Sequence, residues 1–231
     1  GDILVLADET PTQALWLEAK REAGNCLIKL QQFALALEHP GSVVRGAIEN
    51  GAARRVLMGI AMGLTSFALV RSPMGQRSGA HMNPAVTLTF WRLGKMETAD
   101  LLGYAAGQFA GGVAGVALMS LLFTGSIGHP SVNYVATLPG AGGVELAFAA
   151  EVGISFLLMT VVLFSSNHRE WSRYTPVLAG MLVAVYISLE APVSGMSMNP
   201  ARTFASAIVA SKNATPRSAL SEPGLRSSAL S

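Results

Sequence analysis

Long apolar stretches separated by short polar segments dominate this chain of 231 residues. A bilayer core of roughly 30 Å needs about 20 apolar residues as a helix, and tilt or polar ends let somewhat different lengths serve. Four stretches qualify: 56–70, 99–123, 144–164 and 175–189. A fifth, 23–37, is weaker because polar residues such as Lys29 interrupt it, and a charge near the bilayer centre costs about 2.5–3.5 kcal/mol. The pattern predicts an all-α membrane protein.

One of these stretches, 99–123, carries a second pattern of small residues. Gly103, Gly107, Gly111 and Gly115 recur at every fourth position, so they share one helix face that another helix can approach closely. Gln108 lies beside this face and needs a hydrogen-bond partner within the membrane. We therefore expect Gln108 to point to the interior of the protein.

A polar octapeptide occurs twice, as SGAHMNPA at 78–85 and SGMSMNPA at 194–201. Each copy follows a predicted membrane span and precedes an apolar stretch too short to cross a bilayer, 86–93 or 202–210. Asn is a favoured N-cap and Pro suits the first helical position, so each Asn-Pro-Ala predicts the start of a half-helix. Irregular backbone at membrane depth is tolerated only where protein or a water-filled cavity satisfies its polar groups. The two copies therefore predict such a cavity.

The two halves of the chain are expected to be inverted relative to each other. Three crossings separate the span 56–70 from its equivalent, 175–189, so the two half-helices enter from opposite faces of the membrane. Their positive N-terminal ends would then meet near the midplane, where Asn83 and Asn199 offer side-chain amides and the two helix dipoles disfavour cations. A neutral, hydrogen-bonding solute is the expected passenger.

Loop charges predict an orientation. The connections 71–77 and 165–173 each contain two arginines, whereas 124–143 contains no charged residue. The positive-inside tendency places the first two on the cytoplasmic side and the third outside. Arg54 and Arg55 fall on the predicted outer side, and the charge pattern does not explain them.

Composition narrows the function further. Hydrophobic residues make up 51% of the chain and charged residues 13%, and the net charge is only +2, which disfavours a nucleic-acid-binding surface. Cys26 is the only cysteine, so neither an intrachain disulfide nor a cysteine cluster for a metal is expected. We expect no enzymatic activity and no cofactor.

The segments SGAHMNPAVTL and SGMSMNPAR, the glycine-rich helix with Gln108, and Glu151 in the next span resemble the aquaporin, or major intrinsic protein, family over about 45–210. A single Asn-Pro-Ala would be a weak signal, but two at this separation are specific. The resemblance implies an inverted repeat of six spans with two re-entrant half-helices, and one pore in each subunit of a homotetramer. It also implies a multi-pass location in a plasma or bacterial inner membrane and passive conduction of water or small neutral solutes.

The resemblance also implies which residues form the pore. The two pore motifs are Asn83, Pro84, Ala85 and Asn199, Pro200, Ala201. The selectivity filter consists of Met62, Ile187, Met196 and Arg202. Water-selective members usually pair an aromatic residue and a histidine with the arginine, and this sequence has neither. Thr203 stands where glycerol-conducting members typically have Asp, so the solute is left open.

Three ionisable residues are implied to support or line the pore. Glu22 and Glu151 resemble the family's paired buried glutamates, which hold the backbone of the two motif loops. For Glu22, an exposed charge at a helix end is the alternative. His81 matches a pore-facing histidine, and a histidine hydrogen-bonded inside the fold is its alternative.

The predicted channel domain is 1–210, with halves 22–123 and 143–210. No sixth apolar span follows residue 210, and 211–231 is predicted to be a polar, disordered tail. Loss of a sixth helix would impair conduction. The alternatives to a passive channel are a non-conducting remnant that assembles with full-length relatives, and a secondary transporter with broken helices and coupling ions near intramembrane acids.

Overall fold

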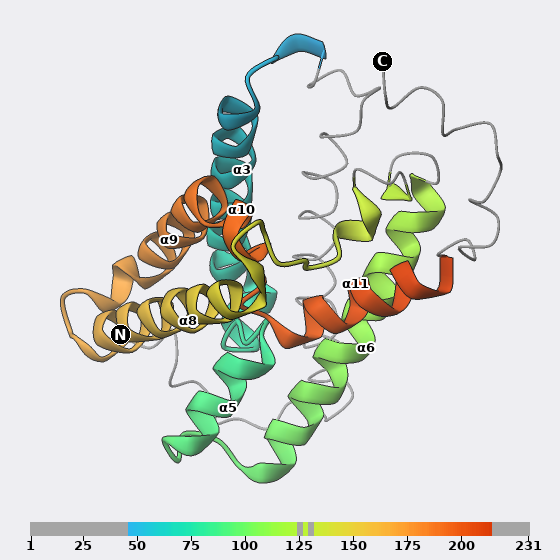
Figure 1. Cartoon of the computed structure of the whole chain (residues 1–231). Coiled ribbons are helices and arrows are strands. Elements are labelled where there is room, and N and C mark those ends of the chain that lie inside the picture. The colour runs from blue at the N-terminus through green and yellow to red at the C-terminus, as the bar shows by residue number, and fades with distance from the viewer. Residues whose placement is uncertain (1–45, 124–126, 129–131, 214–231) are drawn as a thin grey trace, which may run out of the picture.

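A computed structural model describes residues 46–123, 127–128 and 132–213, and within these ranges the chain is helical with no strand (Figure 1). The elements, in chain order, are α3 (Gly51–Arg71), α4 (Pro73–Arg77), α5 (Pro84–Arg92), α6 (Thr98–Leu122), η1 (Asn133–Val135), α8 (Gly143–Asn167), η2 (Ser172–Tyr174), α9 (Thr175–Leu189), α10 (Ala191–Ser194) and α11 (Pro200–Asn213).

The four predicted spans are confirmed. Four helical segments of the described chain are long and apolar enough to cross a membrane: Gly51–Arg71, Thr98–Leu122, Gly143–Asn167 and Ser172–Leu189. α3 begins earlier than the hydropathy pattern predicted because Asn50 caps it, its Oδ1 accepting hydrogen bonds from the N–H groups of Ala52 (2.9 Å) and Ala53 (3.1 Å). The weaker fifth stretch, 23–37, lies outside the described residues.

This early start accounts for one of the two arginines that the charge pattern did not explain. Arg54 lies in the first turn of α3. Its Nη1 donates to the carbonyl oxygens of Ile48 (2.7 Å) and Glu49 (2.9 Å). Arg54 therefore fixes the segment that leads into α3.

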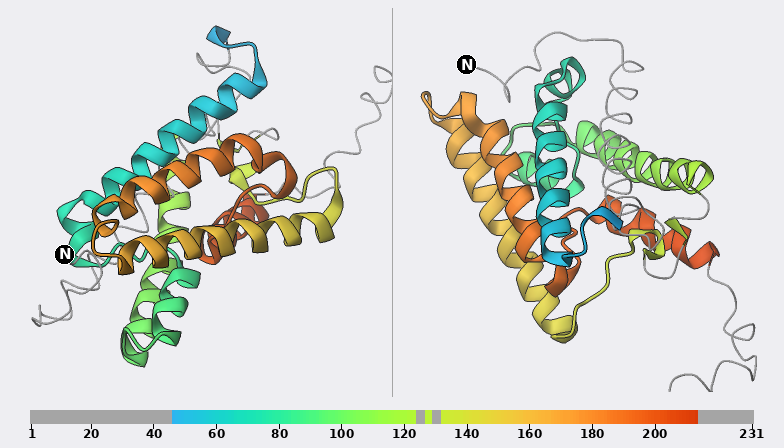
Figure 2. Two further views of the ribbon diagram at one scale, coloured as in Figure 1. Left: turned by 90° about the vertical axis from the view of Figure 1, so that its left-hand side faces the viewer. Right: turned by 90° about the horizontal axis from the view of Figure 1, so that it is seen from above.

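α3 and α9 pack side by side at very close range (Figure 2). A Cβ atom added to Gly63 would lie 2.5 Å from the carbonyl oxygen of Gly180, and one added to Gly180 would lie 2.7 Å from the carbonyl oxygen of Gly63. The two backbones thus touch at this crossing, as small residues permit between membrane helices. α8 packs on α9, to which η2 joins it.

The glycine-rich face of α6 is a packing face, as predicted. Gly111 and Gly115 are buried, and α11 crosses α6 (Figure 1). Val116 of α6 forms a buried cluster with Ala205 and Val209 of α11. Among the described elements, α6 thus packs mainly on the short helix α11.

Each copy of the octapeptide leads into a short helix, α5 or α11, as predicted. α11 continues to Asn213, three residues beyond the domain boundary predicted at residue 210. The remaining tail, 214–231, where the absence of a sixth helix was predicted, lies outside the described residues.

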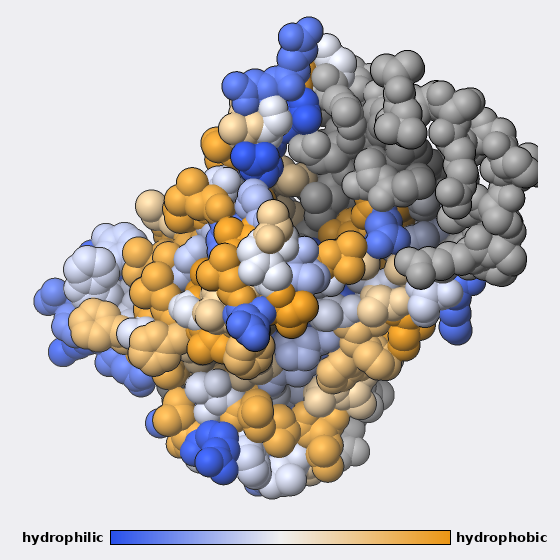
Figure 3. Space-filling view, in the orientation of Figure 1, coloured by the Kyte–Doolittle hydropathy of each residue, from blue (hydrophilic) through white to orange (hydrophobic). Residues whose placement is uncertain are grey.

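The outer surface of α8 is strongly apolar. Figure 3 shows hydrophobic side chains gathered over this helix and its neighbours. Its exposed large hydrophobic side chains are Val144, Leu146, Phe148, Val152, Phe156, Leu157 and Phe164. An exposed apolar surface of this extent is typical of a face in contact with lipid or another protein.

Candidate functional site

The first motif starts α5 in the predicted way. Asn83 is the N-cap with an extended backbone, and its Oδ1 accepts a hydrogen bond from the N–H of Ala85 at 2.9 Å. Pro84 occupies the first helical position, where its missing N–H would have no partner. The N-cap prediction is confirmed here.

The second motif starts α11 by the same chemistry. Oδ1 of Asn199 accepts hydrogen bonds from the N–H groups of Ala201 (3.1 Å) and Arg202 (3.3 Å), and the helix begins at Pro200. α5 and α11 begin close together and run apart (Figure 1).

The two motif loops are tied together by their asparagines. Nδ2 of Asn83 donates to the carbonyl oxygen of Met198 at 2.7 Å, and Nδ2 of Asn199 donates to the carbonyl oxygen of Met82 at 2.9 Å. The sequence predicted that both amides can serve a solute, and in the structure each amide uses one N–H for the opposite loop. An amide nitrogen carries two hydrogens, so one N–H of each asparagine remains.

Left-handed backbone shapes the loop before Asn199. Gly195 has φ +82°, Met196 +45° and Met198 +48°. Non-glycine residues adopt such angles at a cost of roughly 1–3 kcal/mol each, and they persist only where surrounding contacts enforce them. The loop therefore requires an external anchor.

Glu151 of α8 is this anchor. Its Oε1 accepts hydrogen bonds from the Ser197 N–H (2.6 Å) and the Ser194 hydroxyl (2.6 Å), and its Oε2 accepts one from the Met198 N–H (2.7 Å). A carboxylate suits this position because it accepts several bonds at once. The contact between Glu151 and the second loop, implied by the resemblance, is present.

α6 anchors the loop before Asn83. Nε2 of Gln108 donates to the carbonyl oxygen of His81 and to Oγ1 of Thr87 (3.0 Å), as expected for a buried amide. The Tyr104 hydroxyl donates to the carbonyl oxygen of Ser78 at 2.7 Å. Sequence reasoning missed Tyr104, although its position four residues before Gln108, on the same helix face, was the available signal. Glu22, the implied anchor, lies outside the described residues.

A cavity of about 180 Å³ runs beside both motifs. It is bordered by α3, α5, α8, α9, α11 and the two loops, and most of its lining is apolar. The lining residues are Met62, Ser66, Val70, Gly79, Ala80, His81, Met82, Asn83, Val86, Phe90, Leu158, Val162, Thr175, Pro176, Ala179, Val183, Ile187, Met196, Ser197, Met198, Asn199 and Arg202.

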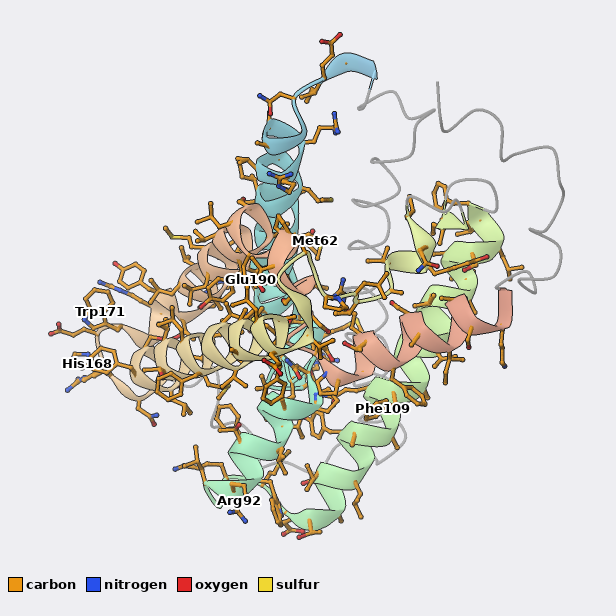
Figure 4. The ribbon with its side chains drawn as sticks, viewed as in Figure 1. Met62, Arg92, Phe109, His168, Trp171 and Glu190 are labelled. Atoms are coloured by element: carbon orange, nitrogen blue, oxygen red, sulfur yellow. The ribbon has the colours of Figure 1, made fainter. Side chains whose placement is uncertain are left out.

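All four implied filter residues line this cavity. Met62, Ile187 and Met196 belong to one buried hydrophobic cluster contributed by α3, α9 and the second loop, and Figure 4 labels Met62. Arg202 is only 5% exposed, and its Nη1 donates to the carbonyl oxygen of Met196 at 2.9 Å. One buried cation thus stands beside three apolar side chains.

Hydroxyl groups support the guanidinium of Arg202. Its Nη1 lies 3.5 Å from Oγ1 of Thr137, which lies 3.5 Å from Oγ1 of Thr203. Thr203 in turn hydrogen-bonds the Ser197 hydroxyl. Sequence reasoning did not find Thr137, because the segment around it carries no pattern.

His81 lies between the cavity and two aromatic side chains. It lines the cavity, and its ring packs against Phe90 (centroids 4.8 Å apart) and Tyr104 (5.3 Å). Elsewhere, the described residues include no group of three His, Cys, Asp or Glu side chains placed to hold a metal ion.

Comparison with known proteins gives several relatives. Aquaporin NIP1-3 of Oryza sativa subsp. japonica is 38% identical over 151 residues, which cover 65% of this chain and 51% of the rice protein. Aquaporin Z of Photorhabdus laumondii is 26% identical over 187 residues, covering 78% of this chain and 80% of the bacterial protein. A probable NIP-type aquaporin of Nicotiana alata is 36% identical over 138 residues, covering 59% of this chain and 49% of the tobacco protein. The chain thus spans about half the length of the two plant relatives.

The fold matches that of a solved channel. The X-ray structure of the aquaglyceroporin from Plasmodium falciparum aligns with a TM-score of 0.73 and 17% identity over 86% of this chain and 81% of that chain. The family profile described as Major intrinsic protein matches residues 33–217. That match covers most of the sequence, and the chain belongs to the major intrinsic protein family.

Proposed function

We propose that this multi-pass membrane protein forms a passive channel for water or other small neutral solutes. In this proposal α5 and α11 are re-entrant half-helices of an inverted repeat, and 22–123 and 143–210 supply its two halves. The members of this family are channels rather than enzymes.

One observation carries the proposal: the reciprocal hydrogen bonds of Asn83 and Asn199 beside a cavity. Each asparagine caps a helix with its oxygen and bridges to the other loop with its nitrogen. Both also line the cavity. A solute there would meet two helix N-termini and the remaining amide N–H groups, which favour a hydrogen-bond acceptor.

The positive charges around the cavity favour a neutral solute over a cation. Each helix N-terminus carries a partial positive charge of roughly half an elementary charge, and both face the same region as Arg202. Together these three positive centres disfavour a cation. A channel that conducts water but excludes protons and metal ions fits this arrangement.

The filter chemistry supports solutes other than water. The apolar side chains of Met62, Ile187 and Met196 can contact a carbon-bearing surface, while Arg202 donates to an oxygen on the opposite side. A compact neutral molecule with one apolar and one hydrogen-bonding face fits both groups, so we propose that such molecules pass along with water.

We also propose a homotetramer in a plasma or bacterial inner membrane, in which each subunit holds its own pore. The exposed apolar face of α8 supports a large non-aqueous contact, with lipid or with a neighbouring subunit. Chemical cross-linking of the protein in native membranes tests this part.

The rate at which liposomes shrink under osmotic stress tests the proposed channel. Purified protein in vesicles is mixed with a membrane-impermeant sugar, and the rate of shrinkage is followed by light scattering. Shrinkage faster than in empty vesicles supports a water channel, and a second gradient made with glycerol or urea measures solute passage.

Two further measurements separate the alternatives. Uptake that requires an imposed proton gradient would instead indicate a secondary transporter. Vesicles that shrink no faster than empty ones, combined with co-purification of a full-length relative from cells that express both, would indicate a non-conducting remnant.

A further inference from the structure

Glu190 is a half-buried acid that the proposed pore does not use. It follows the last residue of α9 and does not line the cavity. Both of its carboxyl oxygens are buried without a hydrogen-bond partner. Buried polar groups almost always have partners, so such an exception needs an explanation. Figure 4 shows Glu190 near the centre of the molecule, where α9, α10 and α8 meet.

Among the described residues, none is recorded as a positive charge that compensates Glu190. Glu151 of α8 acts on it as a second negative charge. The Ser194 hydroxyl, which lies beside both acids, donates to Glu151 instead. Tyr186, one turn earlier on α9, has a buried hydroxyl with no hydrogen-bond partner.

Two further charged side chains, Arg202 and Arg55, lie on helices near this acid. The positive charge of Arg202 on α11 interacts with Glu151, and the guanidinium donates to Met196. On α3, Arg55 is the ionisable residue closest along the helix to the contact of Gly59 with Ser188 of α9.

We infer that Glu190 is a proton-binding site whose ionisation state regulates the second motif loop. Of the two neighbouring acids, Glu151 accepts three close hydrogen bonds and carries the negative charge, whereas neither carboxyl oxygen of Glu190 has a close hydrogen-bond partner, and Glu190 carries a proton. Two neighbouring negative charges whose oxygens are shielded from water oppose each other strongly. Loss of the Glu190 proton therefore places a second negative charge beside the loop anchor.

A continuous set of contacts links this acid to the pore. Ser194 lies between Glu190 and Glu151, Glu151 holds the Met198 N–H, and the Met198 carbonyl accepts the hydrogen bond from Asn83. An ionised Glu190 competes for the Ser194 hydroxyl and repels Glu151. We expect the loop to loosen and permeability to fall as the pH rises.

The direction of this response follows from the environment of the acid. Burial raises the pKa of the Glu190 carboxyl above its ordinary value, the hydroxyl and N–H of Ser194 lower it in part, and the charge of Glu151 raises it. The change therefore occurs above about pH 4.3, the ordinary value of a glutamate.

The experiment compares wild type with Glu190→Gln, which keeps the shape of a protonated glutamate but cannot ionise. Water permeability of vesicles is measured between about pH 4 and pH 9, on both sides of the ordinary value. We expect wild-type permeability to fall with rising pH and Glu190→Gln to retain the low-pH rate throughout. Glu145→Gln, an exposed acid on α8, is the matched control and should keep the wild-type response. A pH-independent wild type, or a variant that responds like wild type, overturns the inference.

A second readout does not depend on conduction. Infrared difference spectra report the carbonyl stretch of a protonated carboxylic acid, and we expect a band that disappears in Glu190→Gln and remains in Glu145→Gln. In Glu151→Gln, where the neighbouring negative charge is gone, the band should titrate at lower pH. An unchanged band in Glu190→Gln refutes the proton site even in a conducting protein. A protein that shows the band but does not conduct refutes the proposed channel and leaves the proton site supported.

Discussion

Asn83 and Asn199 each donate a hydrogen bond to the carbonyl oxygen of the residue that precedes the other asparagine. The two bonds, 2.7 and 2.9 Å long, form a symmetric pair between segments more than a hundred residues apart in the sequence. Each asparagine thus has two structural roles, as a helix cap and as a bridge. Replacing either one should disturb both halves of the site.

We expect Asn83→Ala and Asn199→Ala each to lower permeability and stability. Loss of a cap costs roughly 0.5–2 kcal/mol, and loss of the bridge adds to this cost. Swelling assays and thermal unfolding in detergent measure the two effects.

Asn83→Ser separates the two roles, because serine is a good N-cap but is too short to replace the amide bridge. It should regain part of the stability that Asn83→Ala loses, without regaining permeability. If permeability remains at the wild-type level in both alanine variants, the motif does not form the pore.

Replacement of Arg202 by Val should weaken cation exclusion and solute selection. The change removes the buried positive charge that faces the apolar filter residues. Proton and potassium fluxes in vesicles should rise relative to water flux. Lys212→Val removes an exposed charge from the last turn of the same helix, so its fluxes should match wild type. Equal ion fluxes in Arg202→Val and wild type would move the selectivity barrier away from Arg202.

A filter that contains an aromatic residue and a histidine should favour water over larger solutes. Met62→Phe combined with Ile187→His introduces the aromatic residue and histidine that water-selective members pair with the arginine. We expect the ratio of glycerol to water permeability to fall in the double variant. Met74→Phe, outside the cavity lining, serves as control. A ratio that stays constant would show that these two positions do not select the solute.

Glu151→Gln should destabilise the second loop. A glutamine offers one acceptor oxygen where the carboxylate holds three donors, and an unsatisfied buried donor costs about 1–3 kcal/mol. Faster proteolysis within 190–199 and lower permeability are the expected results. Glu170→Gln, an exposed acid between α8 and α9, should change neither. A protected loop in Glu151→Gln would mean that the strained backbone is held by other contacts.

The helix crossing at Gly63 should tolerate no side chain. Gly63→Leu would push α3 away from α9, because even a Cβ would lie 2.5 Å from the Gly180 carbonyl oxygen. We expect loss of folded protein in size-exclusion chromatography. On α8, a Cβ at Gly153 meets nothing within 4 Å, so Gly153→Leu should remain folded. Similar elution profiles for both variants would refute the tight crossing.

Hydropathy and helix-cap chemistry predicted most of the described fold. α9 covers the predicted 175–189, because its apolar residues are continuous until Glu190. The connection 71–77, in contrast, contains the helix α4. Ser72 caps this helix and Pro73 is its first residue. This is a local sequence signal that the hydropathy pattern does not contain.

The site was less predictable than the fold. Asn83 and Asn199 could be identified as caps because capping depends on local sequence. Their bridging bonds depend on how two distant loops meet, and no local pattern encodes this. The same reason explains why the contact of Thr137 with Arg202 was missed.

The bridge between the two loops uses main-chain carbonyls at positions 82 and 198, so it makes no demand on the side chains there. Met82 and Met198 both line the cavity, and either could be exchanged for another residue while the asparagines keep their acceptors. Substitutions at these two positions can therefore change the lining of the cavity while the hydrogen bonds between the two loops are kept. These two positions are therefore suitable sites for engineering a different solute selectivity.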